Sequence, residues 1–216
     1  GNTAEHKVVL LNYAALMYHI ANWIMSDAQM SQKFPAVINF TGYGSKYIEM
    51  LFGQNRGTDL TLYTRVLFEA FGVTNIPATF SVQFAQNPKA VTAEGAAICA
   101  LEGGANVPQR ATYNFGFTGC QPNDIVHSRD LLDLAPQVMD HFDRFITAFE
   151  SAEHHALNLP SLTDNERCGL RNAAAVSYEQ VVADLANPND AAGSNRVTDS
   201  LFFWALKDAL YNFDQY

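Results

Sequence analysis

Residues 36–45 read Ala-Val-Ile-Asn-Phe-Thr-Gly-Tyr-Gly-Ser, and this stretch decides which fold class the chain adopts. Its first six residues are mostly β-branched or aromatic and are too few for a helix. Such a run is typical of a strand buried on both faces in a parallel sheet. Two glycines follow, and the pattern then predicts a short helix over residues 46–52. A strand, a glycine-rich turn and a helix in this order indicate an α/β fold.

The turn at residues 42–45 is suited to a ligand. In an open α/β sheet, ligands bind at the carboxyl ends of the strands. Gly42 and Gly44 let the backbone approach a ligand that a Cβ atom would repel. The start of the next helix offers unpaired N–H groups that favour an anion such as a phosphate. The pattern therefore predicts a nucleotide or another anion, and the alternative is a tight turn that happens to contain two glycines.

Two common phosphate-binding loops are excluded. The dinucleotide fingerprint Gly-x-Gly-x-x-Gly needs a third glycine at the position where this chain has Tyr47. The Walker loop ends in Gly-Lys-Ser/Thr, and the pair Gly-Lys occurs nowhere in the chain. A nucleotide would have to be bound in another way.

A second segment, residues 87–97, reads Asn-Pro-Lys-Ala-Val-Thr-Ala-Glu-Gly-Ala-Ala. Gly95 lies inside a predicted helix over residues 90–101, where a glycine costs about 1 kcal/mol relative to alanine. Its neighbours are mainly alanines, so this helix has a face of small side chains that a ligand or another backbone can approach closely. The alternative is ordinary tight packing of a helix on a sheet.

The rest of the chain divides near residue 104. Spacings of three and four between apolar residues predict helices over residues 5–26, 59–71, 129–151, 165–185 and 198–213. The first of these helices is apolar around most of its circumference, which is typical of a buried helix. Shorter alternating runs predict strands over residues 78–84, with one face buried, and 112–118. The sequence therefore predicts an α/β domain at residues 5–103 and a mostly helical extension at residues 104–216.

The composition limits the partners and the compartment. The 216 residues include 22 acidic and 13 basic side chains, a net charge of −9. This charge disfavours binding to nucleic-acid backbones and to anionic membrane surfaces, and no apolar run is long enough to span a bilayer. The three cysteines are widely spaced and form no Cys-x-x-Cys pair, which indicates reduced thiols and a cytoplasmic location.

Taken in order, the two glycine-containing segments resemble a known superfamily. A strand that leads into Thr-Gly-x-Gly-Ser, followed later by Asn-Pro and Gly-Ala-Ala, is similar to the nucleotide-binding domain shared by actin, sugar kinases and the heat-shock chaperone ATPases. The second segment resembles the chaperone pattern Asn-Pro-x-Glu-Ala-Val-Ala-x-Gly-Ala-Ala, with matches at Asn87, Pro88, Ala93, Gly95, Ala96 and Ala97. The resemblance covers roughly residues 6–101.

The resemblance implies an actin-like, ribonuclease H-like lobe with a sheet flanked by helices. The nucleotide-binding residues that it implies are Gly42, Tyr43, Gly44, Ser45, Tyr47 and Gly95. Tyr47 occupies the position from which the chaperones reach the adenine ring, and an aromatic ring there could stack on the base. Tyr43 departs from the family pattern, in which a third glycine is common, so its side chain would either stack against the nucleotide or block it.

The resemblance implies ATP, with Mg²⁺, as the ligand. In this superfamily an Asp-x-Gly-Thr/Ser loop of the first lobe holds the outer phosphates and Mg²⁺, and that motif occurs nowhere in this chain. Phosphoryl transfer depends on such metal-held charge neutralisation, so we assign no catalytic or metal-binding residue. The chain is expected to be the carboxy-terminal half of an actin-like ATPase or related kinase. It would be inactive alone, and its partner would be an N-terminal lobe that precedes Gly1.

Two other functions remain open. The first is a non-catalytic protein-interaction module on a degenerate actin-like scaffold, in which the aromatic helical extension contacts a protein partner. The second is an unrelated α/β enzyme that uses the turn at residues 42–45 for a phosphorylated metabolite.

Overall fold

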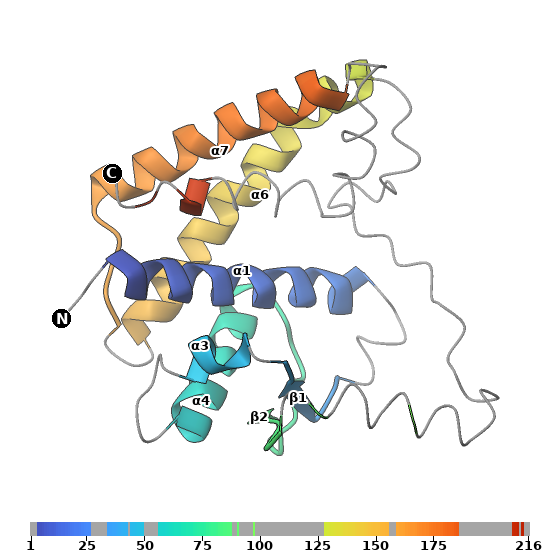
Figure 1. Ribbon diagram of the computed structural model, residues 1–216, viewed down its shortest axis with the longest axis vertical. Helices are drawn as coiled ribbons and strands as arrows, with labels where there is room; N and C mark the ends of the chain where they lie inside the picture. Colours follow the sequence, from blue (N-terminus) through green and yellow to red (C-terminus); the bar gives the residue numbers. More distant parts are fainter. Residues whose placement is uncertain are drawn as a thin grey trace.

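The computed structural model (Figure 1) describes residues 4–26, 34–42, 44–49, 56–87, 90, 97, 128–155, 159–185, 209–211 and 213. Several predictions from the sequence fall outside these residues. They are the side chains of Tyr43 and Gly95, the strand at residues 112–118, the division near residue 104 and most of the helices at residues 90–101 and 198–213.

The described residues form an α/β structure that is dominated by helices. In chain order its elements are α1 (Ala4–Ser26), β1 (Val37–Phe40), α3 (Ser45–Glu49), α4 (Arg56–Ala70), β2 (Ser81–Phe84), α6 (Ser128–His155) and α7 (Asp164–Leu185). The helices predicted over residues 5–26, 59–71, 129–151 and 165–185 are confirmed, with small differences at their ends. None of the described helices is long and apolar enough to cross a membrane.

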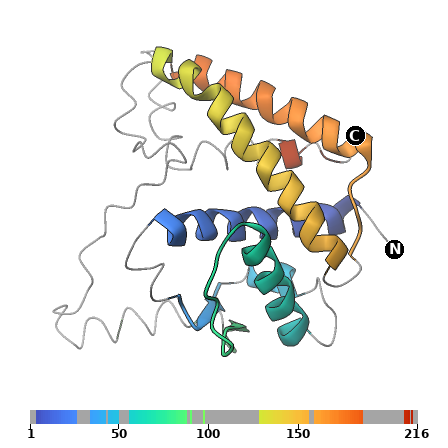
Figure 2. The same ribbon diagram turned by 180° about the vertical axis from the view of Figure 1, so that it is seen from behind.

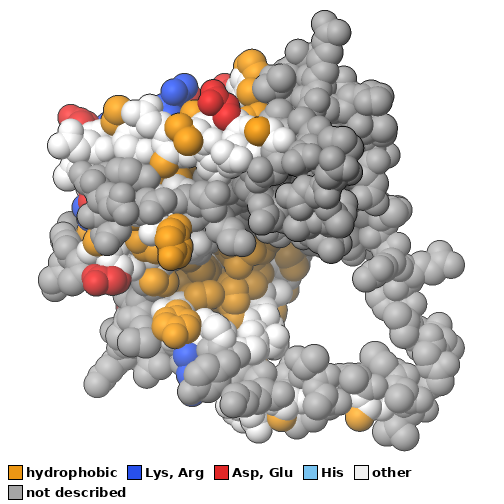
Figure 3. Space-filling model, turned by 45° about the horizontal axis from the view of Figure 1, so that its top comes forward, with side chains coloured by type: hydrophobic (Ala, Val, Ile, Leu, Met, Phe, Trp, Pro, Cys, Tyr) orange, Lys and Arg blue, Asp and Glu red, His pale blue; other side chains and the backbone are white. Residues whose placement is uncertain are grey.

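α1 lies in the middle of the molecule. On one side of it α6 and α7 run next to each other in opposite directions, and on the other side lie α4 and the two strands (Figures 1 and 2). Leu10, Ala14 and Met17 of α1 have no exposed surface, which confirms that this helix is largely buried. Hydrophobic side chains also gather in a hollow at the centre of the face shown in Figure 3. The core therefore forms around α1.

β1 and β2 form a parallel sheet, as the sequence predicts, with Phe40 opposite Phe84. α4 covers the side of β2 that faces away from β1. There the Val82 N–H group donates a hydrogen bond to the Thr61 hydroxyl of α4 at 2.9 Å. A side chain of a helix thus satisfies a backbone group that another strand would otherwise pair with. β2 is therefore an edge strand of the described sheet.

The prediction that the first strand is buried on both faces is wrong. Val37 is 44% exposed and Asn39 is also exposed, whereas Ile38 and Phe40 on the opposite face are partly buried. The described helices reach this strand from one side, where the Phe40 ring packs against the Tyr13 ring of α1 at a centroid distance of 5.8 Å. A strand that packs on one face alternates between exposed and covered side chains, whatever their polarity.

Salt bridges connect α7 to both α1 and α6. Lys7 Nζ of α1 lies 2.8 Å from Glu166 Oε2 of α7, and the two side chains are only 12% and 15% exposed. α7 and α6 are joined by the pairs Arg167–Glu150 and Arg171–Asp143. These contacts connect the last described long helix to the first helix of the chain.

α7 begins with a capping box. The Thr163 hydroxyl accepts a hydrogen bond from the Glu166 N–H group at 3.2 Å, and the Glu166 carboxylate accepts one from the Thr163 N–H group at 2.7 Å. These two bonds satisfy backbone donors that the start of a helix leaves without intrahelical partners. Glu166 therefore caps α7 with the same carboxylate that binds Lys7.

We expect Thr163→Ala to lower the free energy of unfolding by about 1 kcal/mol, because the exposed threonine contributes its cap and little packing. Urea denaturation followed by circular dichroism measures this change. Thr163→Ser keeps a hydroxyl at the same position and serves as the control, with stability close to that of the wild type. Equal stability of the alanine and serine variants would contradict a capping role.

Candidate functional site

The two segments singled out in the sequence leave the sheet at the same edge. Because β1 and β2 are parallel and paired in register, their carboxyl ends lie side by side. The Ala85 N–H group donates to the Phe40 carbonyl at 3.0 Å, which continues the pairing beyond β2. The chain therefore enters the turn at Gly42 and the segment at Asn87 from the same edge of the sheet.

Gly42 has the backbone conformation that requires a glycine. Its φ of 79° lies in the left-handed region, which other residues enter only with strain. A Cβ atom on Gly42 would meet no other atom within 4 Å, and the same holds for Gly44. The first glycine is therefore needed for the shape of the turn, and neither glycine is required by a close neighbour within the described residues.

Ser45 holds the turn in its closed shape. Its N–H group and its hydroxyl both donate to the Gly42 carbonyl, at 3.2 Å and 2.7 Å. The Tyr47 N–H group similarly donates to the Gly44 carbonyl at 3.1 Å. Both N–H groups at the start of α3 therefore have partners inside the turn, and the buried Ser45 side chain shapes the loop from within.

Tyr47 presents its side chain to the surface. It is 67% exposed, although α3 itself packs against α1. An exposed ring on an anchored helix is available for stacking on a flat ligand. The structure thus brings together, on one turn, the predicted residues Gly42, Gly44, Ser45 and Tyr47, whereas Tyr43 and Gly95 lie outside the described residues.

Metal-binding groups do not gather in the described part of the chain. No cluster of three or more His, Cys, Asp or Glu side chains with the arrangement of metal ligands occurs there. The candidate site therefore consists of a backbone turn, the open space beside its two glycines and one aromatic ring.

A second concave site escaped the sequence analysis. It is a cleft of about 500 Å³ between the C-terminal parts of α1 and α4 and the C-terminal half of α6, and its lining includes Tyr18, Asn22, Phe71 and Arg144. The cleft itself could not be predicted, since its walls come from segments far apart in the chain.

Tyr18 forms the best-defined wall of this cleft. Its hydroxyl forms a hydrogen bond of 2.9 Å with His141 Nδ1, and its ring packs edge-on against Phe71 at a centroid distance of 5.0 Å. Burial raises the pKa of the Tyr18 phenol, and the nearby Arg144 guanidinium opposes this rise only in part. The phenol is therefore neutral and fixed in place at physiological pH.

Comparison with protein-family models, curated proteins and solved structures finds no match to this chain.

Proposed function

We propose that the chain binds the adenosine part of ATP at the turn of residues 42–47, as the carboxy-terminal half of an actin-like ATPase. The observation that supports this function is the parallel register of β1 and β2, which brings the start of the glycine turn and the start of the 87–97 segment to one edge of the sheet. A nucleotide at that edge could contact both segments. If the two segments left the sheet at opposite edges, one nucleotide could not reach both.

The described residues suit a base and a sugar better than a triphosphate. An added Cβ atom would meet nothing within 4 Å at Gly42 or Gly44, so a ribose could approach the turn closely, and the exposed Tyr47 ring can stack on a purine. The N–H groups of Ser45 and Tyr47 already have partners in the turn, so they are not free to bind phosphate oxygens. We therefore assign the outer phosphates and Mg²⁺, which supplies charge neutralisation when bound, to an N-terminal lobe.

The experiment is calorimetric titration with ATP and Mg²⁺, on this chain and on a parent protein that includes the N-terminal lobe. We expect weak binding without turnover for the chain alone and tighter binding for the parent. Tyr47→Ala should weaken binding about tenfold in both, because stacking on one base contributes about 1–3 kcal/mol.

Tyr211→Ala is the matched control, since that tyrosine is 86% exposed and lies outside the turn. It should leave the affinity unchanged. The proposal would be wrong if the parent protein gave no binding heat at millimolar nucleotide. It would also be wrong if Tyr47→Ala and Tyr211→Ala bound the nucleotide with equal affinity.

A second candidate is a scaffold that binds no nucleotide. The closed turn favours it, because the Gly42 carbonyl accepts both donors of Ser45 and leaves them nothing to offer a ligand. The same titration separates the two functions. A folded parent protein that binds no nucleotide would support an interaction module on an actin-like scaffold.

A further inference from the structure

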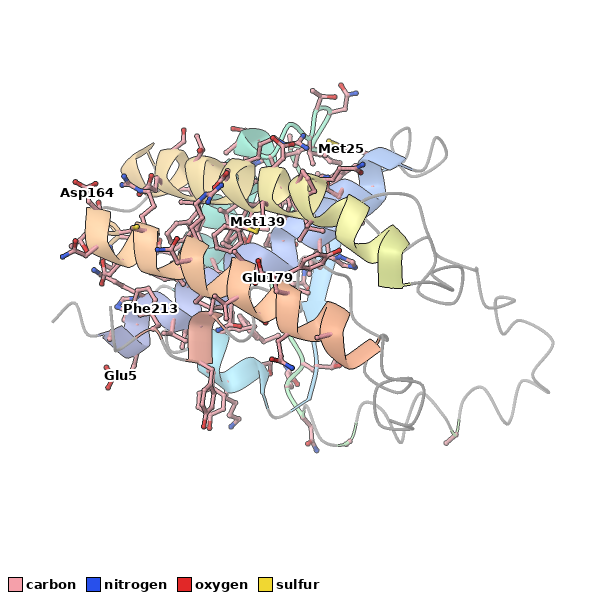
Figure 4. All side chains as sticks on the ribbon, turned by 90° about the horizontal axis from the view of Figure 1, so that it is seen from above. Glu5, Met25, Met139, Asp164, Glu179 and Phe213 are labelled. Atoms are coloured by element: carbon pink, nitrogen blue, oxygen red, sulfur yellow. The ribbon has the colours of Figure 1, made fainter. Side chains whose placement is uncertain are left out.

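The cleft between α1, α4 and α6 has the size and the walls of a small-molecule site. Its volume of about 500 Å³ falls within the usual range for such sites, about 300–1,000 Å³. Apolar side chains from all three directions line it, among them Met25, Phe71 and Ala148. Met25 lies at the C-terminal end of α1 (Figure 4) and is 42% exposed. None of the lining residues belongs to the turn at residues 42–47.

The charged side chains that line the cleft are both neutralised. Asp143 accepts two hydrogen bonds from Arg171, at 2.8 Å and 3.1 Å. Arg144 donates to the Asp140 carboxylate at 2.7 Å. Among the described lining residues, an ionic ligand therefore finds no charged side chain without an oppositely charged partner. The cleft therefore favours a neutral ligand.

The polar groups of the cleft favour a ligand that donates one hydrogen bond. One amide N–H group of Asn22 donates to the Tyr18 carbonyl at 2.8 Å, which leaves the amide oxygen and the second N–H group for a ligand. The Thr147 hydroxyl donates to the Asp143 carbonyl at 2.9 Å, so it can only accept from a ligand. Both side chains line the cleft, and each can accept a hydrogen bond from a ligand.

We propose that this cleft binds a neutral aromatic molecule that carries a single N–H or O–H donor, of the indole or phenol class. The ring lies against Phe71 and Met25, where edge-to-face and sulfur–aromatic contacts are available. The donor reaches the Asn22 amide oxygen. This binding does not depend on a nucleotide.

Calorimetric titration of the wild-type chain with four related probes tests the proposal. Indole should bind saturably. Indole-3-acetate and tryptamine, which add a negative and a positive charge to the same ring, should bind about threefold more weakly, because neither charge gains an unpaired partner in the cleft and displacing a partner from an exposed ion pair costs little. 1-Methylindole, which lacks the N–H group, should bind several-fold more weakly than indole. Failure of indole to bind, or equal or tighter binding of either charged probe, would overturn the assignment.

Two variants locate the site. Ala148→Trp places a large side chain in the cleft and should reduce indole affinity by about tenfold or more. Ala183→Trp makes the same change at an exposed position of α7 and should leave the affinity unchanged. Retained binding in a folded Ala148→Trp protein would place the indole elsewhere and refute the proposal. The probe series uses the wild-type protein, so it decides the question even if Ala148→Trp does not fold.

Discussion

Phe145→Ala is expected to lower the free energy of unfolding by about 3–5 kcal/mol. Phe145 has no exposed surface, and its ring is the point at which three parts of the structure meet. Its centroid lies 5.6 Å from that of Tyr18 in α1 and 6.2 Å from that of Phe71, which follows α4. Within α6 it also lies 6.3 Å from Phe149. Truncation would leave a cavity between all of these rings.

Urea denaturation monitored by circular dichroism and by intrinsic tryptophan fluorescence measures the effect. A domain of this size has a total stability of about 5–15 kcal/mol, so the variant is expected to lose a large part of it and, at the low end of this range, to be partly unfolded at room temperature. Val176→Ala, at a 66% exposed position of α7, should change the stability by about 0.5 kcal/mol or less. A loss below about 1.5 kcal/mol for Phe145→Ala would mean that α1, α4 and α6 do not share one core.

The second large effect is expected at the salt bridge between α1 and α7. Lys7→Met should lower the free energy of unfolding by about 2 kcal/mol near pH 7, because it leaves the nearly buried Glu166 carboxylate without its cation. The double variant Lys7→Met/Glu166→Gln removes the uncompensated charge and should recover part of the loss. A loss for the double variant greater than that for Lys7→Met alone would contradict this account.

The same pair predicts how stability depends on pH. Burial disfavours the ionised form of Glu166, but the hydrogen bonds from Lys7 and Thr163 outweigh it, so the pKa of Glu166 lies below its ordinary value. A depressed pKa in the folded state stabilises the protein above the ordinary glutamate pKa of about 4.3, and the gain is lost as the pH falls through the lower, folded-state pKa. The difference between the wild type and Lys7→Met should therefore shrink in acid.

Denaturation curves at pH 7 and near pH 3 test this dependence. Arg144→Gln is the control, because the Arg144–Asp140 pair is an exposed pair within one helix, with side chains 60% and 64% exposed. Its loss should be about 0.5 kcal/mol or less at pH 7. If the effect of Lys7→Met were the same at both pH values, the ionised form of Glu166 would not be what Lys7 stabilises.

Local patterns in the sequence sufficed for the elements themselves. Helix periodicity predicted α1, α4, α6 and α7, and the alternation of Phe80, Val82 and the residues between them predicted β2 with its single buried face. Gly72 ends the helix that precedes it with φ 92°, as a C-terminal glycine should. These features depend on hydrogen bonds and side-chain spacings between residues that are near one another in the chain. A single sequence is therefore enough to predict them.

The candidate site could be predicted only in part. The sequence predicted a glycine turn whose backbone a ligand can approach, whereas the structure shows that Gly42 is needed for its positive φ. The double hydrogen bond from Ser45 to the Gly42 carbonyl, which closes the turn, could not be foreseen. A serine at the start of a helix can turn its donors inward or outward, and only the three-dimensional geometry of the turn decides between the two.

The sequence by itself determined that this chain has long amphipathic or buried helices, short strands and a glycine turn between a strand and a helix, since each depends on interactions between near neighbours. Only the tertiary structure decided that β1 is covered on one face, that α7 is tied to α1 through Lys7 and Glu166, and that α1, α4 and α6 enclose a cleft. The physical reason is that these features arise from packing and charge pairing between residues far apart in the chain. Many pairings satisfy the same local pattern, and their relative free energies depend on the whole core.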